Sequence, residues 1–367
     1  MSTTTNKPDS EQVSSDDVVI RDSHGDLQQS PSTSTSHSGW RSVLDTLRRN
    51  VRKTLAPAAA VLIVATIPVT KVQGEEARSD QVLRVGFQKY GTLVILKSKG
   101  TLEKRLEPLG VKVQWTEFPA GPQLLEGLNV GSIDFGVTGE APPIIAQAAG
   151  ADLVYVANEP PAPKGEAILV PKDSPLKTVA DLKGKRVGLN KGSNVHYLLI
   201  KALEKAGLKY TDIEVAFLPP ADGRAAFEKG SLDAWVVWDP FYAAAEDQIG
   251  ARKLADGEGI VANTQFYLAS RKYAADHANI INALVEEVGK IDQLTASNPT
   301  EIAGILAPNV GLPVPTVEKA LRRAGFGVQP IGADIAAQQQ NIADTFFSLK
   351  LIPKEIKISD VLWKPAK

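Results

Sequence analysis

A segment of this chain occurs twice in the same order, and this duplication limits the folds that the chain can adopt. The sequence Arg-Val-Gly-Phe-Gln-Lys at residues 84–89 returns as Arg-Val-Gly-Leu-Asn-Lys at residues 186–191, an offset of 102. Two further matches follow at nearly the same offset, residues 119–120 with 220–221 and residues 131–135 with 230–234. Agreement in both order and spacing is typical of a duplicated supersecondary unit.

Each copy alternates short apolar segments with segments of helical periodicity. In the first copy we expect strands over residues 82–87, 111–118, 133–137 and 153–156, separated by helices over 93–106, 122–130 and 141–149. In the second copy, strands include Val187 and Ala234, and residues 194–206 form an amphipathic helix. The alternation predicts an α/β fold with a mainly parallel sheet in each copy.

The two copies predict two lobes that are joined by two crossings of the chain. From Tyr273 onward the pattern is helical almost throughout, and we expect this tail to cover the first copy. The extended apolar segments 165–172 and 265–271 are the expected crossing strands, and together they make a hinge. We therefore assign residues 81–167 and 271–367 to lobe 1 and residues 168–270 to lobe 2, with a ligand cleft between them.

The first 74 residues differ in composition from the rest of the chain. Residues 1–40 are rich in Ser, Thr and carboxylates with few aliphatic side chains, so we expect a disordered acidic leader. In residues 41–74, basic residues at 48–53 precede an uncharged apolar stretch, which is the order of an export signal. We expect cleavage after Gly74 and a periplasmic mature chain.

A membrane anchor is the alternative interpretation of the same stretch. Residues 55–69 contain Pro57 and Pro68, and the stretch is shorter than the roughly 20 apolar residues that span a bilayer. A cleaved signal therefore fits better. Both the general and the twin-arginine export routes stay open, because Arg48 and Arg49 are adjacent.

The composition excludes several classes of function. The 41 Lys and Arg against 42 Asp and Glu leave a net charge of −1, without the basic excess that is typical of nucleic-acid-binding proteins. The chain has no cysteine, which rules out a thiolate nucleophile, a zinc–cysteine site and an iron–sulfur cluster. We expect no cofactor, no metal and no nucleic-acid partner.

Polar residues follow the predicted strands of both copies, at the edge of an open parallel sheet where ligands bind. In the first copy they are Gln88, Lys89 and Tyr90 after one strand, and Thr138, Gly139 and Glu140 after another. In the second copy they are Ser193, Asn194, His196, Trp238 and Asp239. Hydroxyl groups and the free N–H groups of helix N-termini suit a small oxyanion such as a sulfonate, a sulfate or a carboxylate.

Three of these residues also have a purely structural interpretation. Ser193 has the form of a helix N-cap, with or without a ligand contact. Trp238 is either a flat wall of the site or part of the lobe core. Asp239, which precedes Pro240, is placed to cap the next helix.

The candidate residues do not form a recognisable catalytic arrangement. Ser193 and His196 lie three positions apart on one helix, but no carboxylate is identified behind the imidazole. Nothing in the sequence determines the separation of Glu140 and Asp239, so an acid and base pair is unsupported. The sequence predicts a binding protein, not an enzyme.

Four segments carry a resemblance to a known family: Glu-Phe-Pro-Ala-Gly-Pro-Gln at 117–123, Leu-Asn-Val-Gly-Ser-Ile-Asp at 128–134, residues 146–156, and Thr-Val-Ala-Asp-Leu-Lys-Gly at 178–184. Over residues 83–363 the chain resembles the periplasmic aliphatic-sulfonate-binding proteins of ABC importers, in a group that also includes taurine, nitrate and thiamine-precursor binders. The matching cleft positions are Gln88, Thr138, Gly139, Ser193, His196, Trp238 and Asp239. The chain departs from the family at Tyr90, where a Gly/Ser-rich loop is usual, and at Glu140, where Asp is usual.

The resemblance implies a type II periplasmic-binding-protein fold and a function in transport. Its lobes would close on an alkanesulfonate, and the closed monomer would dock on the permease of an ABC importer for sulfur acquisition. Taurine, nitrate and aromatic sulfonates or sulfate esters are the alternative ligands. An enzyme of pyrimidine biosynthesis belongs to the same fold group, but it uses a cysteine-rich motif that this chain lacks.

Overall fold

A computed structural model describes residues 81–364, and it contains two five-stranded sheets, each flanked by helices. The expected leader (1–40), the expected export signal (41–74) and the expected cleavage site after Gly74 lie outside the described residues. Within the described part of the chain, no helix is long and apolar enough to cross a membrane. The predicted α/β class and two-lobed architecture are confirmed.

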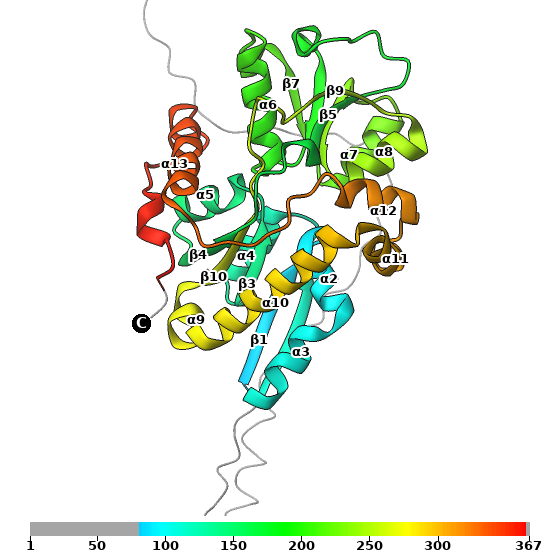
Figure 1. Cartoon of the computed structure of the whole chain (residues 1–367). Helices are drawn as coiled ribbons and strands as arrows, with labels where there is room; N and C mark the ends of the chain where they lie inside the picture. Colours follow the sequence, from blue (N-terminus) through cyan, green and yellow to red (C-terminus); the bar gives the residue numbers. More distant parts are fainter. Residues whose placement is uncertain (1–80, 365–367) are drawn as a thin grey trace, which may run out of the picture. The chain divides into compact units, whose positions relative to one another are not determined.

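The first lobe is built on a sheet with the strand order β2-β1-β3-β10-β4 (Figure 1). Before the first crossing its elements are β1 (Gln81–Phe87), α2 (Gly91–Lys99), α3 (Thr101–Leu106), η1 (Glu107–Leu109), β2 (Val111–Glu117), α4 (Gly121–Asn129), β3 (Phe135–Thr138), α5 (Ala141–Ala148), β4 (Leu153–Asn158) and η2 (Pro163–Gly165). After the second crossing they are β10 (Phe266–Ser270), α9 (Arg271–Asp276), α10 (Ala278–Ser297), α11 (Pro299–Val310), α12 (Val314–Leu321), α13 (Ala333–Ser348) and η5 (Ile358–Val361).

The second lobe repeats this arrangement with the strand order β7-β6-β8-β5-β9, drawn in green in Figure 1. Its elements are β5 (Glu166–Val170), η3 (Val179–Leu182), β6 (Arg186–Leu189), α6 (Asn194–Lys205), η4 (Tyr210–Asp212), β7 (Glu214–Phe217), α7 (Pro220–Glu228), β8 (Ala234–Trp238), α8 (Phe241–Ile249) and β9 (Arg252–Asp256). The two sheets therefore correspond strand by strand, as a duplicated unit requires.

The two crossing strands are the antiparallel members of the sheets. β10 pairs antiparallel with β3 and β4, and β5 pairs antiparallel with β8 and β9, whereas β2-β1-β3 and β7-β6-β8 are parallel. The sheets are thus mixed rather than uniformly parallel, because a strand that enters from the other lobe runs in the opposite direction. Sheet membership changes at residues 165 and 265, slightly before the predicted boundaries of 168 and 271.

The repeated Gly-Ser-aliphatic-Asp segments make the same corner in both lobes. Asp134 Oδ2 accepts a hydrogen bond from the backbone N–H of Arg84 at 2.9 Å, and Asp233 Oδ2 accepts one from the backbone N–H of Arg186 at 2.8 Å. Each Asp also donates its own N–H to the carbonyl of the same arginine. This corner joins the first strand of each copy to the segment that enters the third.

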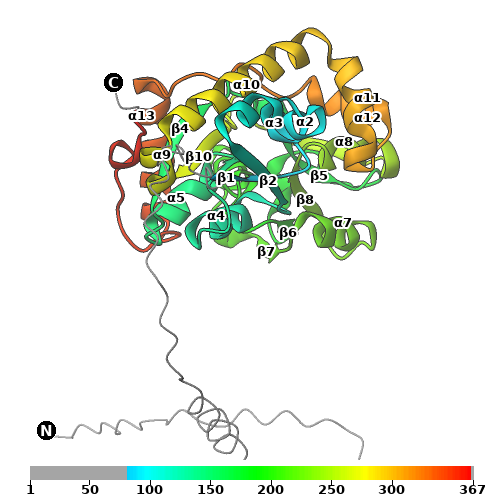
Figure 2. The same ribbon diagram turned by 90° about the horizontal axis from the view of Figure 1, so that it is seen from below.

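Helices cover both faces of the first sheet. Figure 2 shows α2, α3 and α10 on one face and α4 and α5 on the other. Leu83, Val85 and Leu284 belong to the core on the α10 side, and Leu124, Ile144 and Phe346 belong to the core on the other side. The predicted covering of the first lobe by the C-terminal helices agrees with these two cores.

Helix α12 also reaches the second lobe. Its apolar side places Val317 and Leu321 in the α10-side core of the first lobe. Its polar side contacts α8: Thr316 Oγ1 donates to Asp247 Oδ2 at 2.8 Å, and Lys319 pairs with the same carboxylate. The tail therefore forms a contact between the lobes that the sequence pattern did not indicate.

Candidate functional site

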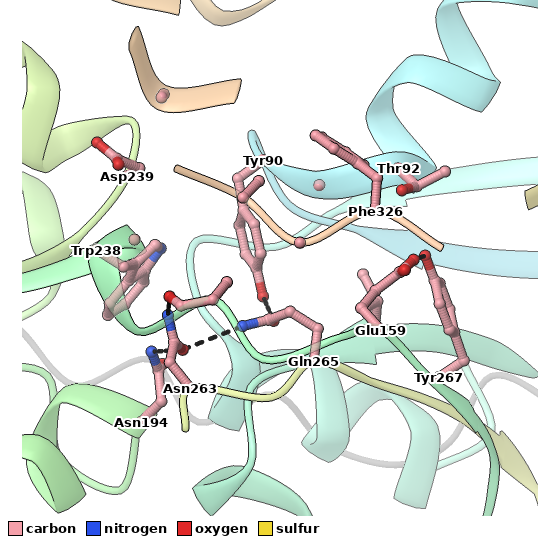
Figure 3. A pocket seen from close by; sticks show the side chains of 17 residues that line it. Tyr90, Thr92, Glu159, Asn194, Trp238, Asp239, Asn263, Gln265, Tyr267 and Phe326 are labelled. Atoms are coloured by element: carbon pink, nitrogen blue, oxygen red, sulfur yellow. Dashed lines mark hydrogen bonds between the residues drawn. The ribbon is translucent and has the colours of Figure 1, made fainter. Parts of the chain in front are cut away.

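One cavity is lined by residues of both lobes and of both crossing segments (Figure 3). From the described residues, its polar and aromatic lining consists of Tyr90, Thr92, Glu159, Asn194, Trp238, Asp239, Asn263, Gln265, Tyr267 and Phe326. The cavity has a volume of about 60 Å³. It lies beyond the carboxyl ends of β1 and β8, which is where an open α/β sheet binds its ligands. We call it the interlobe cavity.

Amide and hydroxyl groups form a chain of hydrogen bonds along one wall of the interlobe cavity (Figure 3). Tyr90 Oη donates to Gln265 Oε1 at 2.6 Å, and Gln265 Nε2 donates to Asn263 Oδ1 at 3.3 Å. Asn194 Nδ2 also donates to Asn263 Oδ1, at 2.9 Å. The chain runs from the loop after β1, through the second crossing segment, to the first residue of α6. Each lobe therefore holds one end of this wall.

Asn194 is also where the lobes touch closely. Its side chain donates to the buried carboxyl group of Glu166, the first residue of crossing strand β5. Burial, and the nearby Glu140 carboxyl, raise the pKa of Glu166 well above its ordinary value. On the other side of Asn194 lies Gly139 of the first lobe, where an added Cβ would meet the Asn194 side chain at 2.9 Å.

Trp238 and Asp239 line the cavity from the second lobe. Trp238 is 6% exposed and belongs to the lobe core as well, so both of its predicted roles fit. Asp239 Oδ1 accepts a hydrogen bond from the Ala243 N–H at 2.9 Å in the first turn of α8, although the N-cap position of that helix is Pro240. Burial raises the pKa of Asp239 to about 7, although Arg323 Nη1 lies 3.6 Å from the carboxylate.

The opposite end of the cavity contains a buried carboxyl pair. Tyr267 Oη donates to Glu159 Oε1 at 2.5 Å, and the Gly327 N–H donates to Glu159 Oε2 at 2.9 Å. Asp292 lies near it and accepts a hydrogen bond from Thr92 Oγ1 at 2.5 Å. Burial and the charge of Asp292 raise the pKa of Glu159 to about 9, so Glu159 is protonated at neutral pH.

A helix N-terminus faces the same space. Gly91 and Thr92, the first two residues of α2, line the interlobe cavity, and the Tyr90 side chain makes no capping hydrogen bond to the helix. The first N–H groups of a helix have no partner within it, and they carry the positive end of the helix dipole. Together with the neutral amides they can bind an anion without a cationic side chain in the lining.

Four of the predicted site residues line the interlobe cavity: Tyr90, Asn194, Trp238 and Asp239. The other seven do not, although several lie directly behind it. Gln88 donates to the Val137 carbonyl at 3.1 Å, and the exposed Lys89 lies 3.7 Å from Glu117. Thr138 is fully buried, and its hydroxyl donates to the Gly139 carbonyl at 3.0 Å.

Glu140 opens on a different cavity, together with Tyr197, Thr264 and Gln339. Its Oε2 accepts a hydrogen bond from the Thr264 N–H at 2.9 Å, while its Oε1 is buried without a partner. Burial raises the pKa of Glu140 to about 7.

Ser193 is buried near the start of α6, and His196 lines a separate cavity together with Pro122 and Ile145 of the first lobe. Ser193 occupies the N-cap position of α6, but its hydroxyl accepts no capping hydrogen bond from the helix; it donates to the Asn190 carbonyl at 2.7 Å. His196 Nε2 lies 2.8 Å from Tyr210 Oη. Burial lowers the pKa of His196 to about 4, so the imidazole is neutral at pH 7.

Sequence reasoning missed several lining residues: Glu159, Asn263, Gln265, Tyr267 and Phe326. Gln265 and Tyr267 lie in the predicted crossing strand 265–271, and Asn263 lies just before it. Because a crossing strand passes between the lobes, its position in the sequence could have identified these three residues as lining residues. Phe326 lies in the tail after α12, where no strand end or motif marks it. Among the described residues, no group of three or more His, Asp or Glu side chains could hold a metal ion.

The chain is similar to known proteins in both sequence and fold. The chain is 48% identical over 309 residues to the aliphatic sulfonates-binding protein of Escherichia coli (strain K12), covering 84% of this chain and 95% of that protein. The alkanesulfonate-binding protein SsuA from Xanthomonas axonopodis pv. citri, solved bound to MOPS, superposes with a TM-score of 0.74 at 45% identity, covering 77% of this chain and 98% of that one.

The periplasmic aliphatic sulphonate binding protein SsuA from Escherichia coli superposes with a TM-score of 0.72 at 49% identity, covering 79% and 94% of the two chains. These relatives are binding proteins by name, which agrees with the prediction that the chain is not an enzyme. The profile of the NMT1/THI5-like family matches residues 107–302. From its matched length, its identity to these relatives and its fold, the chain belongs to the NMT1/THI5-like family and, within it, groups with the aliphatic-sulfonate-binding proteins.

Proposed function

We propose that this protein is the solute-binding component of an ABC importer and that it captures aliphatic sulfonates between its two lobes. The observation that carries the proposal is the interlobe cavity, to which both lobes and both crossing segments contribute. A ligand that touches both lobes has different affinities for the open and closed states, so its binding shifts the chain toward the closed state. Closure around the hinge is then the signal that a ligand is present.

The lining suits a sulfonate group. The N–H groups at the start of α2 supply hydrogen-bond donors, and the indole of Trp238 supplies an apolar wall. A sulfonate is an anion with three acceptor oxygens and no donor, so it matches N–H groups at a helix N-terminus. The described lining contains no Lys, Arg or His side chain, and the positive end of the helix dipole takes that role.

The proposal includes a place and a partner. The protein acts in the periplasm after removal of residues 1–74, and the closed form docks as a monomer on the membrane permease. The SsuA protein from Escherichia coli is a periplasmic binding protein by name, which supports this placement. Taurine, nitrate and aromatic sulfonates are the alternative ligands, and titrations compare them with the alkanesulfonates.

Thermal-shift and calorimetric titrations of the full chain test the function. The ligands are ethanesulfonate, longer alkanesulfonates, taurine, nitrate, sulfate and an aromatic sulfonate. A ligand that binds only the folded state stabilises it by RT ln(1 + L/Kd), where L is the free ligand concentration, so the melting temperature keeps rising with ligand concentration. We expect such a rise, and saturable heats of binding, with at least one alkanesulfonate, and a much weaker response to nitrate and sulfate.

A matched pair of variants links that response to the cavity. Trp238→Ala removes a lining side chain and should weaken sulfonate binding about tenfold or more, whereas Trp363→Ala, which lines none of the cavities described here, should leave it unchanged. Stabilisation by nitrate alone, or by an aromatic sulfonate alone, would contradict the proposed ligand and keep the fold.

A further inference from the structure

Tyr90 lines three neighbouring cavities. One is the interlobe cavity of about 60 Å³. The second, of about 50 Å³, is bounded by Leu306, Val310 and Val317 of the C-terminal helices, and we call it the helix-side cavity. The third, of about 220 Å³, is bounded by prolines and aromatic side chains, and we call it the proline cavity. Other residues border two of them, Asp239 the interlobe and helix-side cavities and Trp238 the interlobe and proline cavities, but Tyr90 borders all three and lies where they meet.

The Tyr90 side chain is held in this position. Its hydroxyl donates to Gln265 Oε1 at 2.6 Å, so the ring extends from the loop after β1 to the second crossing segment (Figure 3). The next residue, Gly91, has φ of +74°, which fixes a turn that most side chains resist. The ring therefore spans the space between the first lobe and the crossing segment rather than lying along the surface.

The space that Tyr90 leaves on the ligand side is small. A single water needs roughly 10 to 15 Å³ on this measure, so the interlobe cavity of about 60 Å³ leaves little room beside a sulfonate group, and it is smaller than the proline cavity of about 220 Å³. A longer alkyl chain has to extend beyond the cavity.

The space behind Tyr90 is suited to an alkyl chain. The proline cavity is lined by Phe118, Trp238 and Phe241 and by prolines from both repeats, and the helix-side cavity is lined mainly by aliphatic residues. Each methylene that leaves water for such a surface strengthens binding about fourfold. Tyr90 stands between the interlobe cavity and most of this surface, of which Trp238, Ala320 and Ala324 also reach the interlobe cavity.

We propose that Tyr90 sets the chain length of the ligand and that the physiological substrates are sulfonates with one or two carbons. This inference rests on the proposed function and narrows its substrate class. Tyr90 acts by closing the interlobe cavity against the two apolar cavities, and the hydrogen bond to Gln265 keeps it closed.

Calorimetry on the full chain with methanesulfonate, ethanesulfonate, butanesulfonate and hexanesulfonate tests the inference. We expect the unaltered protein to bind ethanesulfonate about tenfold or more tightly than hexanesulfonate. Tyr90→Ala should bind hexanesulfonate about tenfold or more tightly than the unaltered protein does. Tyr90→Phe keeps the ring and should therefore still bind ethanesulfonate more tightly than hexanesulfonate. Phe347→Ala removes a surface aromatic on α13 that lines none of these cavities, and it should change nothing.

The outcomes separate this inference from the proposed function. Binding of short and long alkanesulfonates with equal affinity by the unaltered protein overturns the inference and leaves the function intact. The inference is also overturned, and the function left intact, if folded Tyr90→Ala still binds ethanesulfonate more tightly than hexanesulfonate. If no sulfonate binds the unaltered protein, both proposals fail. If Tyr90→Ala melts well below Phe347→Ala, Tyr90→Leu supplies the same comparison with a smaller loss of packing.

Discussion

Gly139 of the first lobe faces Asn194 of the second lobe so closely that a Cβ at position 139 would lie 2.9 Å from both the Cβ and the Cγ of Asn194. Real Cβ atoms do not approach other heavy atoms that closely, so the lobes meet here because residue 139 has no side chain. The contact lies directly behind the interlobe cavity, since Asn194 lines it. The distance between the lobes at this point therefore depends on a single small residue, Gly139.

Gly139→Ala should weaken ligand binding by about tenfold, because overpacking costs roughly 1 to 3 kcal/mol and the contact exists only when the lobes are together. Titration calorimetry with ethanesulfonate measures the change. Gly332→Ala, at the start of α13 with nothing within 4 Å of its added Cβ, is the control and should bind normally. Equal affinities for both variants would show that this contact does not limit closure.

The corner carboxylates Asp134 and Asp233 should contribute unequally to stability despite their equivalent positions. Asp134 is 3% exposed and also pairs with the Arg84 guanidinium at 2.7 Å, whereas Asp233 is exposed. Asp134→Ala should lower the free energy of unfolding by about 2 to 3 kcal/mol and Asp233→Ala by about 1 kcal/mol. Urea denaturation of the two variants makes the comparison, and equal losses would contradict it.

Glu140 should make the protein less stable as the pH rises through neutrality. Burial raises the pKa of this carboxyl to about 7, from an ordinary value of 4.5, so the folded chain holds a proton that the unfolded chain has lost. Its contribution is fully present below about pH 4.5 and is lost as the pH rises through 7. The total is on the order of 3 kcal/mol.

Glu140→Gln should therefore flatten the pH dependence, with the larger gain over the unaltered protein at pH 8 than at pH 5. Chemical denaturation at the two pH values measures it. Glu126→Gln, which alters an exposed carboxylate on α4, is the control and should follow the unaltered protein at both. An identical profile for Glu140→Gln would mean that Glu140 is not the group that titrates.

Arg323 should matter more for ligand binding than Lys319, although both join the tail near α12 to the second lobe. Arg323 stacks on Tyr242 at 4.0 Å and donates to Glu246 at 2.5 Å, and it is also the cation near the buried Asp239. Arg323→Met leaves the buried Asp239 carboxyl and the partly exposed Glu246 without a counter-charge and should weaken binding about tenfold or more. Lys319→Met breaks a more exposed pair and should change the Kd by less than about threefold. Titration calorimetry of both variants at low and at high salt measures the two changes in Kd.

Much of the architecture followed from the repeat. Because the side-chain period of a strand is two, β8 sends Ala234 and Val236 toward α6 and Trp235 and Val237 toward α7 and α8, and this apolar run is readable as a buried strand. The crossing segments were also readable, since each is an extended apolar stretch between the copies. The exact lobe boundaries were not, because sheet membership depends on which strand supplies the hydrogen-bond partner.

The candidate site was also predictable from the sequence only in part. Tyr90, Trp238 and Asp239 follow strands that are visible in the sequence, and the rule that ligands bind beyond strand ends was enough to select them. The same rule also selected Thr138 and Ser193, which lie near the site but donate to neighbouring carbonyls. Nothing in the pattern distinguishes a side chain that faces a cavity from one that faces the adjacent backbone.

The sequence by itself determined the duplicated α/β unit, the two crossings and the family, because periodicity and motif spacing are properties of neighbouring residues along the chain. Only the tertiary structure decided that Arg323 from the tail meets Asp239, that Phe326 from the tail lines the interlobe cavity, and that Tyr90 borders both this cavity and two apolar ones. These contacts join residues that are far apart in the chain, and their positions depend on how the lobes and the C-terminal helices pack together. No local pattern encodes that packing.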